Sequence, residues 1–471
     1  MGDYGGDEKM NVVLKKFQMI GARTIRKYKG IVLLADEMGL GKTLQVLYWL
    51  YRCPKKRPVV IVSPATIKWV WESQAAQHLN MHIEVLQGKK PPRKARFKNK
   101  PSIVVINYEI FKYWVPYIKR LKPKVLVLDE SHKIKNPTAG RTKAIVNLTR
   151  KMKIPHRIAV TGTPLLNNTS ELFTTLNLLW PKKFPSYWRF VFRYCHPRKT
   201  KYGWTFKGAR RTEELHRKLK RFGMIRRLKK DVLKELPAKI RMVIPLEIQH
   251  SREYRMASRD FLNWLKGKDI TKLHKAKKAK AMLRVGYLKR LAAELKMKSV
   301  FKWLDDFLET TDKKIVVFAH HTKIINMLHK RYKKTSVVVK GGVSQKKRQR
   351  AVKAFQTGKP RMFIGNILAA GVGLTLTAAE DLAFVELDFV PGNMIQAEDR
   401  IHRIGQRNAA CIYYLVAKGT MEEGLCETLQ KKQKNISKVL EGKGDNTNEL
   451  NIFEIMMEAM DKDIQKKGKQ K

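Results

Sequence analysis

Residues 31–43 read I-V-L-L-A-D-E-M-G-L-G-K-T, and this stretch decides the fold of the region around it. Its first five residues form a short apolar run that predicts a buried strand, and the residues after Thr43 have the apolar spacing of a helix. Gly39 and Gly41 allow the connecting loop to wrap, so that its main-chain N–H groups and the helix N-terminus face phosphate oxygens. This order predicts a phosphate-binding loop, although a plain strand-to-helix turn would use the same residue types.

The chemistry of the loop gives its last two residues distinct roles. Lys42 would hold the β- and γ-phosphates of ATP, and the Thr43 hydroxyl would ligate Mg²⁺. The usual phosphate loop opens with a glycine, and Asp36 stands at that place here. We expect the whole loop to contact the nucleotide, namely Asp36, Glu37, Met38, Gly39, Leu40, Gly41, Lys42 and Thr43.

A pair of carboxylates follows a second apolar run, where residues 125–132 read V-L-V-L-D-E-S-H. Asp129 is placed to hold the Mg²⁺ shell, and Glu130 is placed to orient and deprotonate the attacking water. The chemistry needs both groups, because the water must meet a γ-phosphoryl group whose charge is already partly neutralised. The alternative is that the two acids merely begin a helix.

Short β-branched runs alternate with helical patterns in two separate parts of the chain. In the first part the strands are expected at residues 31–35, 59–63, 103–107, 125–128 and 157–161. In the second part they are expected at residues 314–319, 335–339, 362–366, 382–387 and 412–416. Alternation of this kind is typical of parallel sheets covered on both faces, so the expected fold class is α/β with two lobes.

The stretch between the lobes, residues 172–299, lacks the strand rhythm and is rich in basic and aromatic residues. We expect it to be mostly helical, with a break near Pro237. Residues 182–230 hold eighteen Lys or Arg against two Glu, a charge of 18 − 2 = +16, and include Trp188, Phe190, Tyr194 and Trp204. This imbalance favours contact with phosphates over a merely solvated surface. The basic loop at residues 88–100 fits a phosphate contact and a solvated connector equally well.

Composition indicates a folded protein with a polyanionic partner. The 471 residues include 99 Lys or Arg and 40 Asp or Glu, so the formal charge is 99 − 40 = +59. A charge of this size points to nucleic acid, and a hydrophobic fraction of 43% excludes a wholly disordered basic tail protein.

Four scattered cysteines predict neither a disulfide framework nor a zinc site. The N-terminus shows no signal pattern, and no apolar run approaches the length of a membrane span. We therefore expect a soluble intracellular protein with no membrane partner. It would act in the nucleus of a eukaryote, or in the host or bacterial cytoplasm if it is of phage or bacterial origin.

These motifs resemble those of the D-E-x-H helicases of superfamily 2, and within it the Swi/Snf-type ATPases. Besides the loop and the D-E-S-H box, the resemblance rests on five segments between about residues 15 and 438. They are S-P-A at 63–65 with Trp71 and Glu72, T-G-T-P-L-L-N-N at 161–168, M-I-R-R-L-K-K-D-V at 224–232, G-V-G-L-T-L-T-A-A at 371–379 and Q-A-E-D-R-I-H-R-I-G-Q at 396–406. The family shares the aspartate at the start of the loop.

The resemblance implies two tandem RecA-like P-loop NTPase lobes with a basic, largely helical insertion. The expected domains are residues 11–170 for lobe one, 171–299 for the insertion and 300–440 for lobe two, with tails at 1–10 and 441–471. The segments F-A-H-H at 318–321 and E-L-D-F-V-P-G at 386–392 look most like those of the annealing-helicase (HARP-like) fork-remodelling branch. This implies ATP-driven movement on double-stranded or forked DNA, by a protein that we expect to be monomeric on DNA. We expect no HARP repeat, zinc finger or nuclease in the tails.

Family motifs also assign further site residues. Gln18 would read the adenine edge, and Arg400 and Arg403 would neutralise transition-state charge, with Gln396 aligning their motif and binding nucleotide. The resemblance places DNA contacts at Ser63, Pro64, Ala65, Asn107, Tyr108, Thr161, Gly371, Gly373 and Thr375. The plainer alternatives are a solvent-facing glutamine, a surface arginine pair and ordinary turns.

Three other functions fit parts of the pattern. A remodeller of chromatin or of other protein–DNA complexes would share the motor. A non-catalytic, basic scaffold that binds nucleic acid would be expected to have lost Lys42, Glu130 or Arg403, and all three are intact. An RNA helicase fits less well, because the M-I-R-R-L-K-K-D-V segment and the long helices between the lobes favour duplex DNA.

Overall fold

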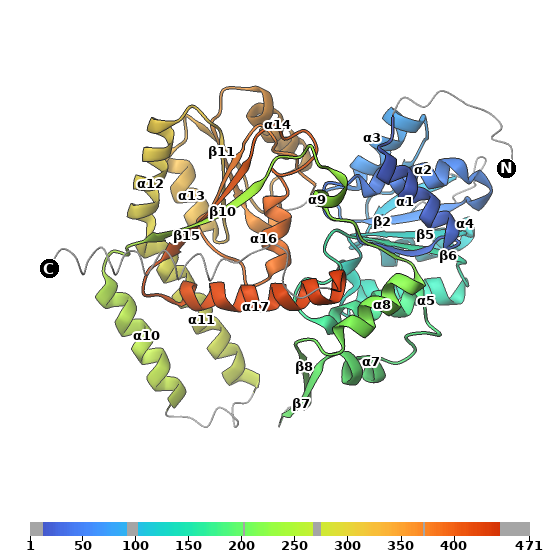
Figure 1. Cartoon of the computed structure of the whole chain (residues 1–471), viewed down its shortest axis with the longest axis horizontal. Helices are drawn as coiled ribbons and strands as arrows, with labels where there is room; N and C mark the ends of the chain where they lie inside the picture. The colour runs from blue at the N-terminus through green and yellow to red at the C-terminus, as the bar shows by residue number, and fades with distance from the viewer. Residues whose placement is uncertain (1–12, 92–101, 201–202, 267–274, 371–372, 443–471) are drawn as a thin grey trace. The chain divides into compact units, whose positions relative to one another are not determined.

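A computed structural model describes residues 13–91, 102–200, 203–266, 275–370 and 373–442 (Figure 1). The chain divides into two compact units, which are described separately. Unit 1 comprises residues 1–196, 206–234 and 436–443, and unit 2 comprises residues 197–205, 235–435 and 444–471. Among the described helices, none is long and apolar enough to cross a membrane.

Unit 1 is built on a seven-stranded parallel sheet with the order β3-β4-β2-β5-β6-β1-β9. Its strands are β1 (Ile31–Leu34), β2 (Val59–Ser63), β3 (Glu84–Val85), β4 (Ile103–Asn107), β5 (Val125–Asp129), β6 (His156–Val160) and β9 (Met224–Ile225). All five strands expected in this part are present, with ends shifted by at most one residue.

Helices cover both faces of this sheet, as the continuous apolar strands predict. The helices of unit 1 are α1 (Lys16–Lys27), α2 (Lys42–Arg52), α3 (Lys68–Leu79), α4 (Val115–Leu121), α5 (Gly140–Lys151), α6 (Phe173–Leu179), α7 (Tyr187–Tyr194), α8 (Thr212–Phe222) and α9 (Lys229–Val232). Successive residues of a strand point to opposite faces of the sheet, so they pack in different core clusters. Val59 and Ile61 pack in the cluster under α1, α2 and α3, whereas Val60 and Val62 pack in the cluster under α4 and α5.

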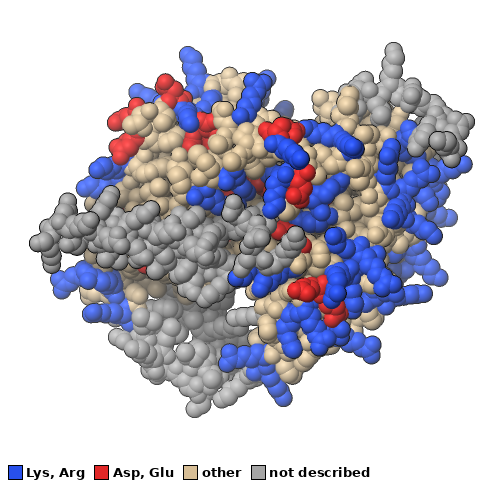
Figure 2. Space-filling model, viewed as in Figure 1, with Lys and Arg blue, Asp and Glu red and all other residues tan. Residues whose placement is uncertain are grey.

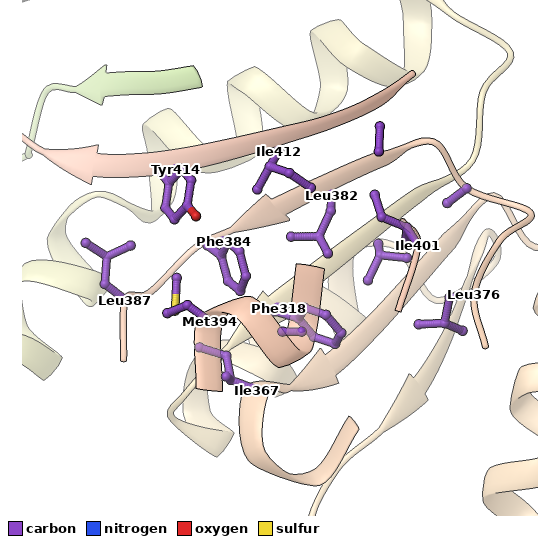
Figure 3. Packing of buried hydrophobic residues seen from close by; sticks show 14 of the residues in the cluster. Phe318, Ile367, Leu376, Leu382, Phe384, Leu387, Met394, Ile401, Ile412 and Tyr414 are labelled. Carbon is purple, nitrogen blue, oxygen red and sulfur yellow. The ribbon is translucent and has the colours of Figure 1, made fainter. Parts of the chain in front are cut away.

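Unit 2 contains a six-stranded parallel sheet with the order β10-β15-β14-β11-β13-β12. Its strands are β10 (Lys239–Leu246), β11 (Ile315–Ala319), β12 (Ser336–Val339), β13 (Met362–Asn366), β14 (Asp381–Phe384) and β15 (Ala410–Ala417). Its helices are α10 (Ser251–Lys266), α11 (Lys275–Leu295), α12 (Met297–Thr310), α13 (Thr322–Arg331), α14 (Gln345–Thr357), α15 (Ile367–Ala370) and α16 (Pro391–Glu398), and α17 (Met421–Glu441) begins here. Figure 3 shows the core on one face, where Phe318, Phe384 and Tyr414 meet Met394 of α16.

The stretch between the expected lobes contains the predicted helices and also four strands that the sequence analysis did not predict. β7 (His196–Thr200) and β8 (Gly203–Lys207) form a two-stranded sheet, β9 pairs with β1, and β10 pairs with β15. β9 has only two residues, and β10 carries Lys and Arg among its apolar residues, so neither has the pattern of a buried strand. The stretch therefore completes both sheets and is not solely a helical insertion.

Candidate functional site

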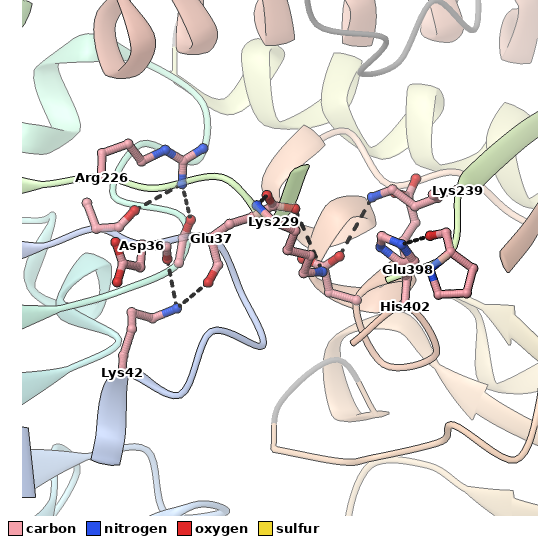
Figure 4. Close-up of polar contacts among 12 residues, drawn as sticks. Asp36, Glu37, Lys42, Arg226, Lys229, Lys239, Glu398 and His402 are labelled. Carbon is pink, nitrogen blue, oxygen red and sulfur yellow. Dashed lines mark hydrogen bonds and ion pairs between the residues drawn. The ribbon is translucent and has the colours of Figure 1, made fainter. Parts of the chain in front are cut away.

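The loop between β1 and α2 has the backbone that a phosphate site requires. Gly39 and Gly41 adopt φ angles of 84° and 66°, a left-handed region that favours glycine, and Gly41 is the N-cap of α2. Lys42 begins the helix, and its ammonium group donates to the main-chain oxygens of Asp36 at 2.8 Å and Glu37 at 3.1 Å (Figure 4). Burial lowers the pKa of Lys42 below its ordinary value, and Glu130, Asp36 and Asp129 oppose this shift.

The Asp36 side chain is buried and is held by Arg227. One carboxylate oxygen accepts from the main-chain N and the Nε of Arg227, each at 3.0 Å, and the other accepts from Gln45 Nε2 at 3.0 Å and from the end of the same guanidinium. Asp36 therefore ties the start of the loop to the segment after β9. The expected contact of Asp36 with nucleotide stays a prediction for its main chain, because the carboxylate is already engaged.

The same segment holds the rest of the loop through residues that sequence reasoning did not assign to the site. Glu37 accepts a 2.6 Å hydrogen bond from the main-chain N of Lys229. Arg226 donates to the main-chain oxygens of Ala35 and Gly162, at 3.0 and 3.3 Å. The M-I-R-R-L-K-K-D-V motif was the available signal, but its partners Ala35 and Glu37 lie 191 and 192 residues away in sequence, and Gly162 lies 64 residues away.

Gln18 lies against the loop, although nothing in its local helix requires this. Its side chain is 5% exposed and accepts from the main-chain N of Lys15 at 3.0 Å. A Cβ built on Gly41 would come within 2.4 Å of Gln18 Nε2, so the amide fills the space beside that glycine. This placement supports the expected nucleotide contact, and the adenine role itself stays a prediction.

The two carboxylates that follow β5 have different partners. Asp129 accepts from Trp71 Nε1 at 2.8 Å and from the main-chain N of Glu130 at 3.0 Å. Burial and the neighbouring Glu130 raise the pKa of Asp129 to about 7, while the Trp71 hydrogen bond and Lys42 oppose the shift. Glu130 has a φ angle of 51°, which is rare for a residue with a side chain and is typical of strain at functional sites.

The turn after β6 holds Glu130. The Thr161 hydroxyl donates to the Glu130 carboxylate at 3.1 Å and accepts from the main-chain N of Thr163, also at 3.1 Å. His132 Nδ1 lies 3.2 Å from the same hydroxyl and 3.3 Å from Glu130 Oε2. A Cβ on Gly162 would lie 2.2 Å from Met38 Cγ and 3.2 Å from Lys42 Nζ, so this turn packs directly on the phosphate loop.

The side-chain oxygen atoms present fit a magnesium ion that is bound together with a nucleotide. Mg²⁺ is usually bound through one or two carboxylates plus substrate phosphates, and it keeps several waters. Asp129 supplies a carboxylate whose two oxygens each accept one N–H group, and Thr43 supplies a hydroxyl in the first turn of α2. Across the described parts of the chain, no cluster of three or more His, Cys, Asp or Glu could hold a metal by itself. Such a site depends on the nucleotide for most of its ligands.

The expected DNA contacts in unit 1 are mostly covered. The side chains of Ser63, Tyr108 and Thr161 have no exposed surface, and Tyr108 donates to the main-chain oxygen of Asp129 at 2.7 Å. Pro64 and Asn107 are buried, whereas Ala65 is exposed. The burial of the first three side chains argues against direct contact through them, so only main-chain contacts stay a prediction there.

In unit 2, the arginine motif is fastened to the loop that carries the other expected DNA contacts. Arg400 and Arg403 both donate to the main-chain oxygen of Leu374, each at 3.3 Å. Arg400 is 5% exposed and also donates to the main-chain oxygen of Gln396 at 2.9 Å, and the aligning role of the Gln396 side chain stays a prediction. Arg403 is only partly buried, so it has the greater freedom to meet a ligand.

The loop held by the two arginines keeps part of its surface accessible. Gly373 is exposed, with a φ angle of 77°, and Thr375 is partly exposed. Gly371 lies outside the described residues. Contacts of Gly373 and Thr375 with DNA stay a prediction.

A buried charge cluster fixes the helix that precedes the arginines. Glu398 is fully buried, and its carboxylate pairs with Lys239 at 2.9 Å (Figure 4). It also pairs with Arg241 at 2.6 Å, and both partners come from β10. Burial would raise its pKa, but Arg241 and Lys239 bring the pKa of Glu398 below its ordinary value. His402 Nε2 lies 2.9 Å from the main-chain oxygen of Pro237. The segment near Pro237 and β10 therefore braces the arginine motif.

Two known protein-family models match the chain. A family model described as the SNF2-related domain matches residues 22–299, and one described as the helicase conserved C-terminal domain matches residues 297–405.

Known relatives match most of the chain. The SWI/SNF-related matrix-associated actin-dependent regulator of chromatin subfamily A-like protein 1 of Xenopus tropicalis is 32% identical over 91% of this chain and 45% of its own length. The DNA annealing helicase and endonuclease ZRANB3 of Homo sapiens is 31% identical over 93% of this chain and 41% of its own length. The chain thus spans less than half of either relative. The solved Sulfolobus solfataricus SWI2/SNF2 ATPase core in complex with dsDNA has a TM-score of 0.42 and 23% identity, over 92% of this chain and 94% of that one.

Proposed function

The chain belongs to the SNF2-related family, and from this premise we propose that it is a DNA-stimulated ATPase that moves along double-stranded DNA. The observation that carries the proposal is the set of phosphate-binding and acidic residues gathered in unit 1. Lys42, Asp129 and Glu130 interact electrostatically within one site, and the loop around Lys42 has the backbone of a phosphate cradle. A scaffold without catalysis would not need this set.

Within this proposal, each residue has a task that follows from its position. Lys42 exchanges its main-chain acceptors for the β- and γ-phosphates of ATP. Glu130, oriented by the Thr161 hydroxyl, accepts the proton of the attacking water. Asp129 and Thr43 are the residues that would hold Mg²⁺, which neutralises part of the phosphate charge when bound.

We assign Arg403 to the charge that develops on the γ-phosphoryl group. An arginine that acts in the transition state is worth roughly 10³ to 10⁵ in rate. Arg400 is more deeply buried and tied to two main-chain oxygens, so it positions the Leu374 loop and its neighbour. Because Arg403 belongs to unit 2, turnover is proposed to require both units.

The DNA partner is supported by charge. The chain carries +59, and blue Lys and Arg side chains far outnumber red Asp and Glu on the face shown in Figure 2. Contacts to phosphates carry no sequence information, so binding should be weakly selective for sequence and should fall steeply with salt. A protein of this kind would work where DNA is kept, which is the nucleus in a eukaryote.

The finer activity is proposed to be the remodelling or annealing of forked DNA. One relative is named a DNA annealing helicase, and the segments F-A-H-H at 318–321 and E-L-D-F-V-P-G at 386–392 resemble those of that branch. Remodelling of chromatin is the second candidate, because another relative is named a regulator of chromatin.

ATPase rates measured in parallel with no nucleic acid, single-stranded DNA, duplex, forked DNA, RNA and nucleosomes test the proposal. We expect stimulation by duplex and most by forked DNA, and none by RNA. Preferential stimulation by nucleosomes would favour the second candidate. Turnover that is indifferent to every polynucleotide would exclude a DNA-driven motor.

A further inference from the structure

A pocket of about 620 Å³ lies in unit 1 at the edge of the sheet opposite the phosphate loop. It is lined from three sides, by residues at the end of α1, by the end of α2 with the turn that follows it, and by the start of β6. Gly30 precedes β1, whereas the phosphate loop follows that strand, and strands of a parallel sheet run from one edge to the other. The pocket is therefore separate from the nucleotide site already described.

The charged residues that line this pocket are all cations. Five of its ten residues are cations, namely Arg26, Lys29, Arg52, Lys55 and Lys56, and none is Asp or Glu. Among the described residues, Arg26, Lys29, Lys55 and Lys56 form no ion pair with a carboxylate. Like charges gathered in a concave site raise the energy of the folded chain unless an anion neutralises them.

A structural explanation covers only part of this charge. Arg26 lies in the last turn of α1 and Arg52 in the last turn of α2, where a cation stabilises the negative end of a helix. Lys29 lies outside both helices, and Lys55 and Lys56 lie in the single 3₁₀ turn Pro54–Lys56, so the ends of α1 and α2 do not account for these three lysines.

The remaining side chains that line the pocket include Trp49 and His156, which pack closely against each other and against Gly30. Trp49 is 3% exposed and meets the His156 ring edge-on at 6.2 Å, and a Cβ on Gly30 would lie 3.1 Å from both residues. His156 Nδ1 lies 2.7 Å from the main-chain oxygen of Lys29, which, with that nitrogen as donor, leaves Nε2 as an acceptor in the neutral ring. Burial lowers the pKa of His156, and Lys56 and Arg157 lower it further, so the ring is held neutral.

We propose that this pocket binds clustered phosphate groups and is a second anion site, distinct from the phosphate loop. Its size falls within the range of small-ligand pockets, roughly 300 to 1,000 Å³. Lysines bind phosphate as point charges without requiring one fixed geometry, so phosphates of a free polyphosphate or of a DNA backbone are recognised by the same chemistry. The inference goes beyond the proposed motor activity and does not depend on it.

The test uses the full chain carrying Lys42→Ala, which removes the phosphate grip of the nucleotide loop. Titration calorimetry with inorganic triphosphate should show binding that Lys29→Glu/Lys56→Glu weakens by about tenfold or more. The neutral Lys29→Gln/Lys56→Gln should give a smaller loss, which guards against misfolding of the charge-reversed form. The matched control Lys143→Glu/Lys151→Glu makes the same charge change on exposed positions of α5 and should leave the affinity unchanged.

A second arm identifies the source of the phosphates. The slope of log affinity against log salt for duplex DNA should fall by about 2 in the pocket variant, relative to the control, if the pocket holds two backbone phosphates. An unchanged slope with lost triphosphate binding assigns the pocket to a free polyphosphate. If neither measurement depends on the pocket lysines, the inference is overturned. The triphosphate arm remains informative even if the chain has no DNA-driven ATPase activity.

Discussion

The Thr161 hydroxyl donates a 3.1 Å hydrogen bond to the carboxylate of Glu130, so the turn after β6 holds the group that we expect to activate water. Thr161→Val keeps the shape but removes this donor. We expect ATP turnover to fall by about tenfold to a hundredfold, with duplex affinity unchanged. Thr161→Ser, which keeps the hydroxyl, is the control. If Thr161→Val instead weakened duplex affinity and left ATP turnover unchanged, Thr161 would be a DNA contact, as the family motif implies.

Lys42→Ala or Glu130→Gln should abolish ATP turnover and leave most DNA binding intact. Lys42→Ala removes one charge from a chain that carries +59, and Glu130→Gln removes none of its cations. Turnover and duplex affinity are measured side by side, with Lys143→Ala as the control for a lost surface cation. Equal loss of both activities in a folded variant would contradict the separation of the two functions.

Arg403→Ala should lower turnover far more than ATP affinity, by roughly 10³-fold or more if the residue acts only in the transition state. The kcat and KM for ATP decide this, and Arg407→Ala, an exposed arginine four residues later, is the control. A raised KM with an unchanged kcat would instead assign Arg403 to ordinary binding of ATP.

Arg400→Ala should differ from Arg403→Ala in stability. Arg400 is 5% exposed and donates to the main-chain oxygens of both Leu374 and Gln396, so its loss removes two buried hydrogen bonds, although Arg403 still donates to the Leu374 oxygen. The free energy of unfolding should fall by about 1 to 3 kcal/mol, measured by urea denaturation, and less for Arg403→Ala. If Arg400→Ala and Arg403→Ala lowered the free energy of unfolding equally, Arg400 would not stabilise the Leu374 loop more than Arg403 does.

The magnesium requirement should depend on pH through Asp129. Its pKa of about 7 lies above the ordinary 3.8, so the folded chain binds this proton more tightly than the unfolded chain. The stability that Asp129 contributes is therefore present in acid and is lost as the pH rises toward about 7. Mg²⁺ needs the carboxylate, so the Mg²⁺ concentration for half-maximal ATPase should rise as the pH falls below about 7.

Trp71→Phe sharpens the same measurement. The indole N–H favours the charged form of Asp129, so its removal should move the midpoint of the Mg²⁺ dependence to higher pH. If the midpoint is the same in Trp71→Phe as in the unaltered chain, the pH effect does not arise from Asp129.

Much of the fold was accessible from local patterns. Apolar runs such as residues 125–128 are buried on both faces of a parallel sheet, and such runs reveal a strand without knowledge of its neighbours. The sequence did not predict β9 and β10, because each has little apolar pattern of its own. β9 gains its strand conformation by pairing with β1, and β10 by pairing with β15. The phosphate loop was predicted, but the Arg227 side chain that anchors Asp36 was not.

By itself, the sequence determined where the expected hydrolytic residues stand, since Lys42, Thr43, Asp129 and Glu130 have spacings that a strand and its following loop impose locally. Only the tertiary structure decided which side chains support them. Asp36 meets Arg227 across 191 residues, and Arg403 meets Leu374 across 29. Such pairs depend on the order of strands within a sheet and on the packing of helices over it. No short-range pattern of residue types encodes that information, because the contacts form only when the core is assembled.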